Sequence, residues 1–192
     1  KELQSYVIGL ALGDGNLSVI RKTVRLRITC DKKYPFLYKK IFNSLTLLLP
    51  DNKVNIIDRD SSCLDISVYS NYLEKLLGWK AKNGSKFLQK VSIPNWIKEN
   101  NNYKINCLRG LIETDGSIYS DRGYTMMIFK SIIPTLARDF YNIIIDLGFR
   151  PHWYKIRPKK TLAYQFNQQT AYHIRLSKNV ANFLELVKPE KI

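Results

Sequence analysis

The feature that most constrains the fold of this chain is an internal repeat. The stretch VIGLALGDG at residues 7–15 returns as LRGLIETDG at residues 108–116, with Asp14 aligned on Asp115. Both copies are apolar, contain a glycine in the middle and end in Asp-Gly. A unit that recurs at one offset, together with the segments that follow it, indicates a chain built from two similar halves.

The segments after each copy follow the same order. The alternating segments TVRLRIT and YTMMIFK lead in both halves to a predicted helix that starts at a proline, Pro35 or Pro134, a residue that suits the first helical turn. Two further strands and a last helix follow, so each half is predicted as helix, two strands, helix, two strands, helix. The strands are expected at residues 23–29, 53–59, 63–70, 124–130, 150–157 and 172–177, and the last helices at about 70–78 and 177–187.

The fold class predicted from this order is α+β, with two αββαββα halves related by a pseudo-twofold axis and packed through the two motif helices. Residues 1–98 form the first half and residues 99–192 the second, joined through the turn-rich stretch SIPNWIKENNNYK at residues 92–104. The motif helix of the first half is apolar almost all round, so we expect it to be buried against its repeat. Gly9 allows a second backbone to approach closely.

The charge of the chain indicates the chemistry of its partner. Lys and Arg number 31 against 16 Asp and Glu, a formal charge of +15, and this excess indicates a polyanion, with nucleic acid ahead of an anionic membrane surface. No apolar run is long enough to span a membrane, and the three cysteines are too scattered for a zinc site or a disulfide framework, so we expect them to be packing residues. These observations favour an intracellular protein, in a bacterial or archaeal cytoplasm or in an organelle.

Alternation in the strands places many of these basic residues on one face. Leu26 and Ile28 lie on the side of the strand opposite to Arg25 and Arg27, because successive strand residues point to opposite sides. Such a polar face is either an ordinary solvated sheet surface or a surface that reaches phosphates and base edges in a DNA groove, and the net charge favours the groove. The residues expected to contact DNA are Arg21, Thr23, Arg25, Arg27, Thr29, Asn55, Arg59, Asp65, Ser67, Tyr124, Met126, Lys155, Arg157, His173 and Arg175.

The repeated aspartates are unfavourably placed unless a cation joins them. Asp14 and Asp115 come at the carboxyl ends of their helices, where the partial charge is already negative. Two carboxylates beside the free carbonyl groups of two helix ends form an oxygen-rich site that suits Mg²⁺. Asp-Gly is also common in ordinary turns, but its recurrence at two such helix ends favours the metal site.

These residues resemble a known family, the LAGLIDADG homing endonucleases or meganucleases. VIGLALGDG and LRGLIETDG align on the motif that gives the family its name, and the order of elements around them covers essentially the whole chain. Two motifs in one chain resemble the monomeric members, whose halves form a saddle with β-sheets in the DNA major groove. Leu12 departs from the pattern, because its counterpart Glu113 holds the acidic position of the motif.

The resemblance implies a metal-dependent endodeoxyribonuclease that cuts both strands of a long asymmetric target, as in intron homing. Asp14 and Asp115 would hold two or three Mg²⁺ ions, assisted by the backbone carbonyls of Gly13 and Thr114. Such ions activate water and neutralise charge on the phosphate, so a histidine base is not required. His152 and His173 do not adjoin either acidic motif, and we expect them at the surface or on the DNA face.

Two lysines are candidates for a catalytic role, although each could also be a solvated surface residue. Lys130 ends the outward face of the strand after the second motif, where the first half has Thr29, so the two sites would differ chemically. Lys86 is the second candidate because, by the resemblance, the family often places a lysine before an Ile-Pro turn. Both would neutralise charge on the phosphate in the transition state.

Three functions are open at this point. The first is the site-specific DNA endonuclease, and the second is a maturase that binds its host intron RNA on the same scaffold. The third is a DNA-binding regulator without catalysis, against which the two intact acids argue, because a binding protein could replace them and avoid their mutual repulsion.

Overall fold

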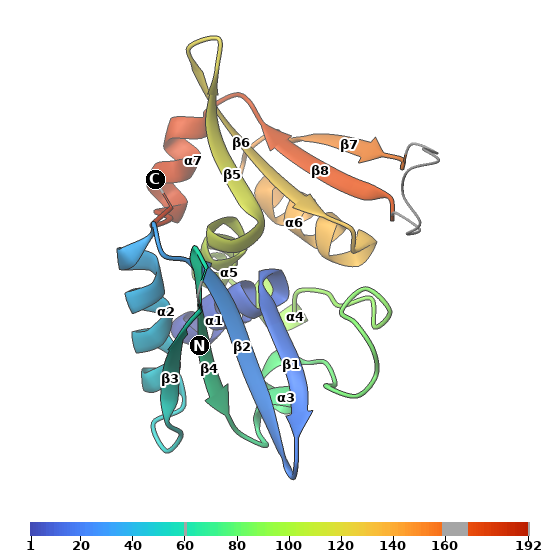
Figure 1. Cartoon of the computed structure of the whole chain (residues 1–192). Coiled ribbons are helices and arrows are strands. Elements are labelled where there is room, and N and C mark those ends of the chain that lie inside the picture. The colour runs from blue at the N-terminus through green and yellow to red at the C-terminus, as the bar shows by residue number, and fades with distance from the viewer. Residues whose placement is uncertain (60, 159–168, 192) are drawn as a thin grey trace.

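The computed structural model describes residues 1–59, 61–158 and 169–191, and it contains two halves with the same order of elements (Figure 1). The first half consists of α1 (Glu2–Gly13), β1 (Gly15–Ile20), β2 (Thr23–Asp31), α2 (Pro35–Leu48), β3 (Val54–Asp58), β4 (Cys63–Tyr69) and α3 (Leu73–Leu77). After a short helix, α4 (Asn95–Lys98), the second half consists of α5 (Asn101–Asp115), β5 (Gly116–Asp121), β6 (Tyr124–Ser131), α6 (Pro134–Asp146), β7 (His152–Ile156), β8 (Ala171–Leu176) and α7 (Val180–Val187). The predicted α+β fold with two αββαββα units is therefore confirmed.

Each half contains one four-stranded antiparallel sheet. The strand orders are β1-β2-β4-β3 and β5-β6-β8-β7, so the two sheets have the same topology. The register is also equivalent, because Thr29 pairs with Asp65 in the first sheet and Lys130 pairs with His173 in the second. In each sheet the apolar face is covered by helices, with residues such as Leu26 and Phe129 completely buried.

The two motif helices pack against each other at the centre of the molecule, between the two sheet-bearing halves (Figure 1). Their backbones are so close that a Cβ atom on Gly9 would lie 2.2 Å from the carbonyl oxygen of Cys107, and one on Gly110 would lie 2.5 Å from that of Tyr6. Real Cβ atoms do not approach backbone oxygen so closely, so both positions require glycine. The repeated glycine of the motif therefore sets the distance between the halves.

Some details differ from the sequence-based expectation. The stretch 92–104, expected as a turn region, contains α4 and the start of α5, whose N-cap residue Asn100 accepts a hydrogen bond from the backbone N of Tyr103 at 3.2 Å. Backbone N–H groups in the first turn of a helix have no helical carbonyl to donate to, and the Asn100 side chain supplies an acceptor for one of them. This is why an Asn-rich stretch can begin a helix. Cys30 and Cys107 are buried as expected, whereas Cys63 is only half-buried.

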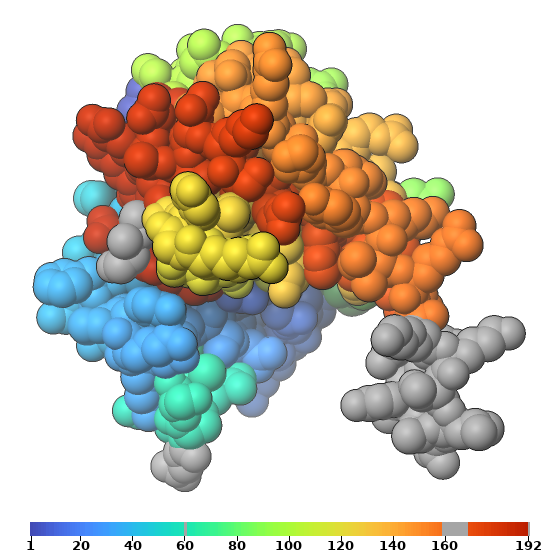
Figure 2. Space-filling view, turned by 90° about the horizontal axis from the view of Figure 1, so that it is seen from above, coloured from blue at the N-terminus to red at the C-terminus, as the bar shows by residue number. Residues whose placement is uncertain are grey.

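The two halves are in contact outside the central helices as well, because Thr135 Oγ1 donates hydrogen bonds to the carbonyls of Lys90 at 3.0 Å and Val91 at 2.7 Å. In the space-filling view (Figure 2), the yellow hairpin of β5 and β6 adjoins the red segment that contains α7. Within the described part of the chain, no helix is long and apolar enough to cross a membrane.

Candidate functional site

The ends of the two motif helices bring the two repeated aspartates into one region. Asp14 is the residue that caps α1, Asp115 is the last residue of α5, and the first strand of each sheet begins at the next residue. A Cβ atom on Gly13 would lie 3.4 Å from Oδ2 of Asp115, so the end of one helix faces the carboxylate of the other. Burial and, to a smaller extent, the negative charge of Asp14 raise the pKa of Asp115 to about 6. Burial also raises the pKa of Asp14.

Two lysines donate hydrogen bonds to the carbonyl groups at these helix ends. Lys86 Nζ donates to the carbonyl of Leu12 at 2.7 Å and also to those of Ala11 and Gly13, all near the end of α1. Lys191 Nζ donates to the carbonyls of Thr114 at 2.9 Å and Gly116 at 3.2 Å, at the end of α5. Both ammonium groups thus lie where helix ends favour cations, and both lower the pKa of each aspartate against the effect of burial.

The predicted lysine Lys86 therefore lies at the site, and Lys191 is a site residue that sequence reasoning missed. Burial lowers the pKa of Lys86 to about 8, although both aspartates oppose this shift. Lys191 escaped notice because the offset that aligns Asp14 with Asp115 does not align Lys86 with Lys191. No local pattern shows that the chain returns to α5 after α7.

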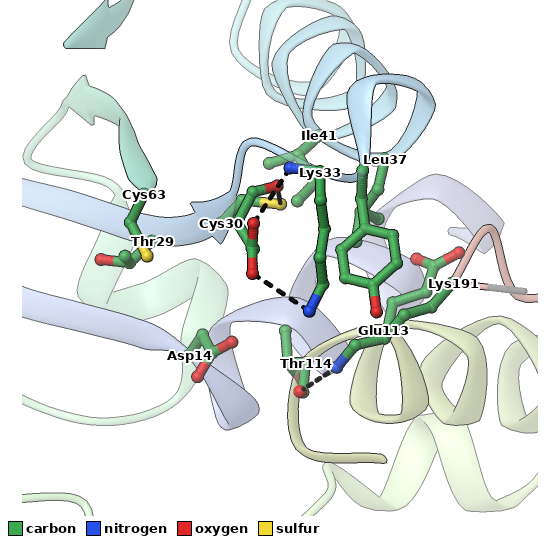
Figure 3. Close-up of a pocket in the computed structure, with 12 residues that line it drawn as sticks. Asp14, Thr29, Cys30, Lys33, Leu37, Ile41, Cys63, Glu113, Thr114 and Lys191 are labelled. Carbon is green, nitrogen blue, oxygen red and sulfur yellow. Dashed lines mark hydrogen bonds and ion pairs between the residues drawn. The ribbon is translucent and has the colours of Figure 1, made fainter. Parts of the chain in front are cut away.

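A pocket lies on each side of the aspartates, and the two pockets differ in chemistry. The first has a volume of about 270 Å³ and combines three carboxylates with the ammonium groups of Lys33 and Lys191, with the half-buried Cys63 beside Thr29 (Figure 3). Its lining includes Asp14, Thr29, Cys30, Asp31, Cys63, Glu113, Thr114 and Lys191. The second has a volume of about 430 Å³ and is basic, and its lining includes Gly13, Lys86, Asp115, Lys130 and His173.

The second pocket brings His173 close to one of the two aspartates. The sequence places this residue far from both acidic motifs, yet β8 pairs with β6 so that His173 lies opposite Lys130, and both line the pocket that contains Asp115. Burial and the neighbouring charge of Lys130 lower the pKa of His173. His152 is exposed on β7, as expected.

The donor atoms at the site fit a hard divalent cation. Two carboxylates face the space between the helix ends, and carboxylate and carbonyl oxygens are the ligands that Mg²⁺ and Ca²⁺ prefer. The carbonyls of Gly13 and Thr114 accept hydrogen bonds from lysines, but a carbonyl oxygen has two lone pairs and retains capacity for an ion. Among residues 1–59, 61–158 and 169–191, His, Cys, Asp and Glu form no group of three or more that could hold a metal ion. The remaining ligands would come from carbonyls, water or a bound phosphate.

The residues expected to contact DNA occupy three environments. Arg21 lies in the turn between β1 and β2 with a positive φ of 55°, and Arg157 follows β7, so both lie outside the strands. The exposed members of the set are Arg21, Arg59, Tyr124, Lys155 and Arg157. The half-buried members are Thr23, Arg25, Arg27, Thr29, Asn55, Met126, His173 and Arg175, and the buried ones are Asp65 and Ser67.

The expectation that Asp65 is open to DNA is wrong, because its carboxylate is only 4% exposed and is already engaged. It accepts hydrogen bonds from Thr29 Oγ1 at 2.7 Å and from Arg59 Nε at 2.7 Å, and a guanidinium nitrogen of Arg27 lies 4.0 Å away. The alternation of residues along a strand predicts on which face of the sheet a side chain lies, but it does not predict which neighbouring side chains cover it. In this structure Asp65 therefore accepts hydrogen bonds from side chains of the chain itself.

The same face carries buried polar atoms that have no hydrogen-bond partner within the described residues. Ser67 is also covered, contrary to expectation, at 1% exposure, and its hydroxyl is one of these atoms. Buried polar atoms are normally hydrogen-bonded, so this group points to a polar partner or to water on the sheet faces. The atoms are Ser18 Oγ, Arg25 Nε, Arg27 Nε and Ser67 Oγ in the first half and Arg175 Nε in the second.

Part of the chain matches a protein family, and nearly all of it superimposes on solved structures. Residues 102–188 match the family described as LAGLIDADG-like domain. Mesophilic variants of the homing endonuclease I-DmoI share 15% identity at a TM-score of 0.69, covering 97% of this chain and 94% of theirs. I-DmoI in complex with DNA and Mn has the same identity and TM-score and covers 97% of this chain and 96% of its own.

A different protein shares the fold as well. The N-terminal LAGLIDADG domain of DUF199/WhiA is 15% identical at a TM-score of 0.62, over 97% of this chain and 82% of that one. No curated protein matches the sequence. At this level of identity the structural likeness establishes the fold alone, so any activity must be argued from the site.

Proposed function

We propose that the protein is a site-specific double-strand DNA endonuclease of the homing type that depends on divalent metal ions. One observation carries the proposal: each half contributes one carboxylate, Asp14 or Asp115, to a shared region between two sheets with basic faces. A protein that only bound DNA would gain nothing from two carboxylates, of which Asp14 raises the pKa of Asp115. I-DmoI, with the same fold, is a homing endonuclease that has been seen with DNA and Mn.

Some residues of the site would bind the cation, and others would neutralise charge on the phosphate. Asp14 and Asp115 would hold Mg²⁺ with the carbonyls of Gly13 and Thr114, and the bound ions would supply an activated water and neutralise charge on phosphorus. Lys86 is already fixed at the site by its hydrogen bonds to α1. It would add positive charge where negative charge develops on the phosphate.

The two strands of the DNA would meet different side chains. On the side of Asp115, Lys130 and His173 line the pocket, whereas the equivalent register positions in the first half are Thr29 and Asp65. Lys130 is exposed and would approach a phosphate, and the Arg side chains of both sheets would contact the groove. Because one chain supplies both halves, it would act as a monomer.

The experiment that tests this function is recovery of a cleavage site. Purified protein is incubated in Mg²⁺ with plasmids that carry randomised inserts, and the linear products are sequenced. We expect a single recurrent sequence among the linearised plasmids, because two basic sheet faces with different side chains read an asymmetric site.

Degradation without a recurrent sequence would contradict site-specific cleavage. Retention of plasmids on the protein without any linear product would instead favour the non-catalytic regulator. Stronger binding to a structured RNA than to duplex DNA would favour the maturase.

A further inference from the structure

The buried carboxylate of Glu113 joins four separate segments of the chain. Its side chain is fully buried, and Oε2 accepts a hydrogen bond from the Tyr6 hydroxyl of α1 at 2.6 Å. Oε1 accepts one from the backbone N of Glu190 at 2.8 Å and one from Lys40 Nζ of α2 at 3.4 Å. Lys40 Nζ also lies 3.1 Å from a carboxylate oxygen of Glu190. Glu113, Lys40 and Glu190 therefore form one network of hydrogen bonds.

This network fixes the segment after α7 against the motif helix. The backbone N of Glu190 donates to Glu113, and the next residue, Lys191, donates to the carbonyl of Gly116. Lys191 also donates to the carbonyl of Thr114, as the dashed line in Figure 3 shows. Lys191 lines the pocket that contains Asp14, and its charge lowers the pKa of that aspartate against the effect of burial. The position of the ammonium group therefore depends on where Glu113 holds the chain.

We propose that Glu113 is a positioning residue, which anchors residues 188–191 on α5 so that Lys191 presents its charge to the cleavage site. This inference rests on the proposed endonuclease function. Thr114 and Asp115 follow Glu113 directly on α5, so one helical turn carries the anchor, a carbonyl bound by Lys191 and a carboxylate of the site.

Comparison with the first motif shows that the helix pair does not itself require an acid at this place. The equivalent residue is Leu12, which is 1% exposed and whose side chain has no hydrogen-bonding group, so only its backbone carbonyl accepts a hydrogen bond, from Lys86. A buried carboxylate is costly unless it is paired and hydrogen-bonded, and Glu113 has both kinds of partner. The presence of an acid at this position of the second motif is therefore explained by its hydrogen bond to the segment of residues 188–191.

The test compares Glu113→Leu, which introduces the residue of the first motif, with Glu113→Gln, Lys191→Met and their combinations. Lys188→Met is the matched control, because it removes the same charge from an exposed residue of the same segment. Three quantities are measured: hydrogen exchange at the Glu190 amide, the single-turnover cleavage rate on the site recovered from the plasmid library, and DNA affinity in Ca²⁺.

We expect Glu113→Leu to speed exchange of the Glu190 amide and to lower the cleavage rate about tenfold or more with DNA affinity unchanged. Glu113→Gln keeps an acceptor for that amide and should retain much of the rate. Lys191→Met should lower the rate by a similar factor, and the double variant should be no slower than either single one, because the two residues act as one unit. Lys188→Met should cut like the wild type.

Unchanged exchange of the Glu190 amide in Glu113→Leu would overturn the anchor, and multiplication of the two rate losses in the double variant would overturn the link to Lys191. A wild-type protein that cuts no site would overturn the proposed endonuclease function and the catalytic purpose of the anchor. The exchange measurement would separate that failure from a failure of the anchor itself.

Discussion

Replacing Asp14 or Asp115 with asparagine is expected to lower the DNA cleavage rate by at least about a thousandfold while changing DNA affinity little. Asparagine has nearly the same shape, but it removes a negative charge from the shared region, and a divalent ion then loses a carboxylate ligand. The sheet faces that would contact the groove remain unchanged. The measurement is single-turnover cleavage of the recovered site, beside binding of the same duplex in Ca²⁺.

Stability provides the control for this experiment. The charge of Asp14 raises the pKa of Asp115, so in metal-free protein the two carboxylates oppose each other. Loss of one charge should leave the thermal midpoint of the metal-free protein unchanged or raise it. A variant that cuts at the wild-type rate would show that the cleavage site lies elsewhere, whereas a variant that unfolds would show that these acids have a structural role.

Replacing Gly110 with alanine is expected to lower the free energy of unfolding by about 2 to 3 kcal/mol. The added Cβ would lie 2.5 Å from the carbonyl oxygen of Tyr6 and 2.6 Å from the backbone N of Leu10, so the two motif helices would have to separate. Alanine favours a helix over glycine by about 1 kcal/mol, which offsets only part of this cost. The measurement is denaturant unfolding of the purified variant.

The control for Gly110→Ala is Lys39→Ala on an exposed position of α2, which should change stability by less than about 0.5 kcal/mol. Because the helix ends carry Asp14 and Asp115, a shift of the helices should also lower cleavage in the fraction that remains folded. A Gly110→Ala variant as stable as the wild type would contradict the close contact between the two helices.

Much of the architecture was predictable from the sequence because it depends on local patterns that occur twice. The repeated motif predicted the central helix pair, and the prolines at Pro35 and Pro134 marked the starts of α2 and α6. Alternation identified the core residues of β2, with Leu26 and Ile28 fully buried. These features depend on spacing along one segment, which a sequence displays directly.

The parts of the site that escaped prediction depend on segments that meet only in the fold. Lys191 reaches α5 after the chain has passed through the whole second half, and His173 reaches Lys130 only through the pairing of β8 with β6. Asp65 lies on the expected face, but Arg59 and Thr29 cover and engage it. In each case the missing information is the register or the path of a distant segment.

Exchange of the cation shows directly whether the two helix-end carboxylates form a metal-dependent cleavage site. Wild-type protein is given the recovered DNA site with Mg²⁺, with Ca²⁺ or with EDTA, and both binding and strand cleavage are followed. We predict cleavage of both strands in Mg²⁺, binding with little cleavage in Ca²⁺, and no cleavage in EDTA. Undiminished cleavage in EDTA would contradict this account of the site.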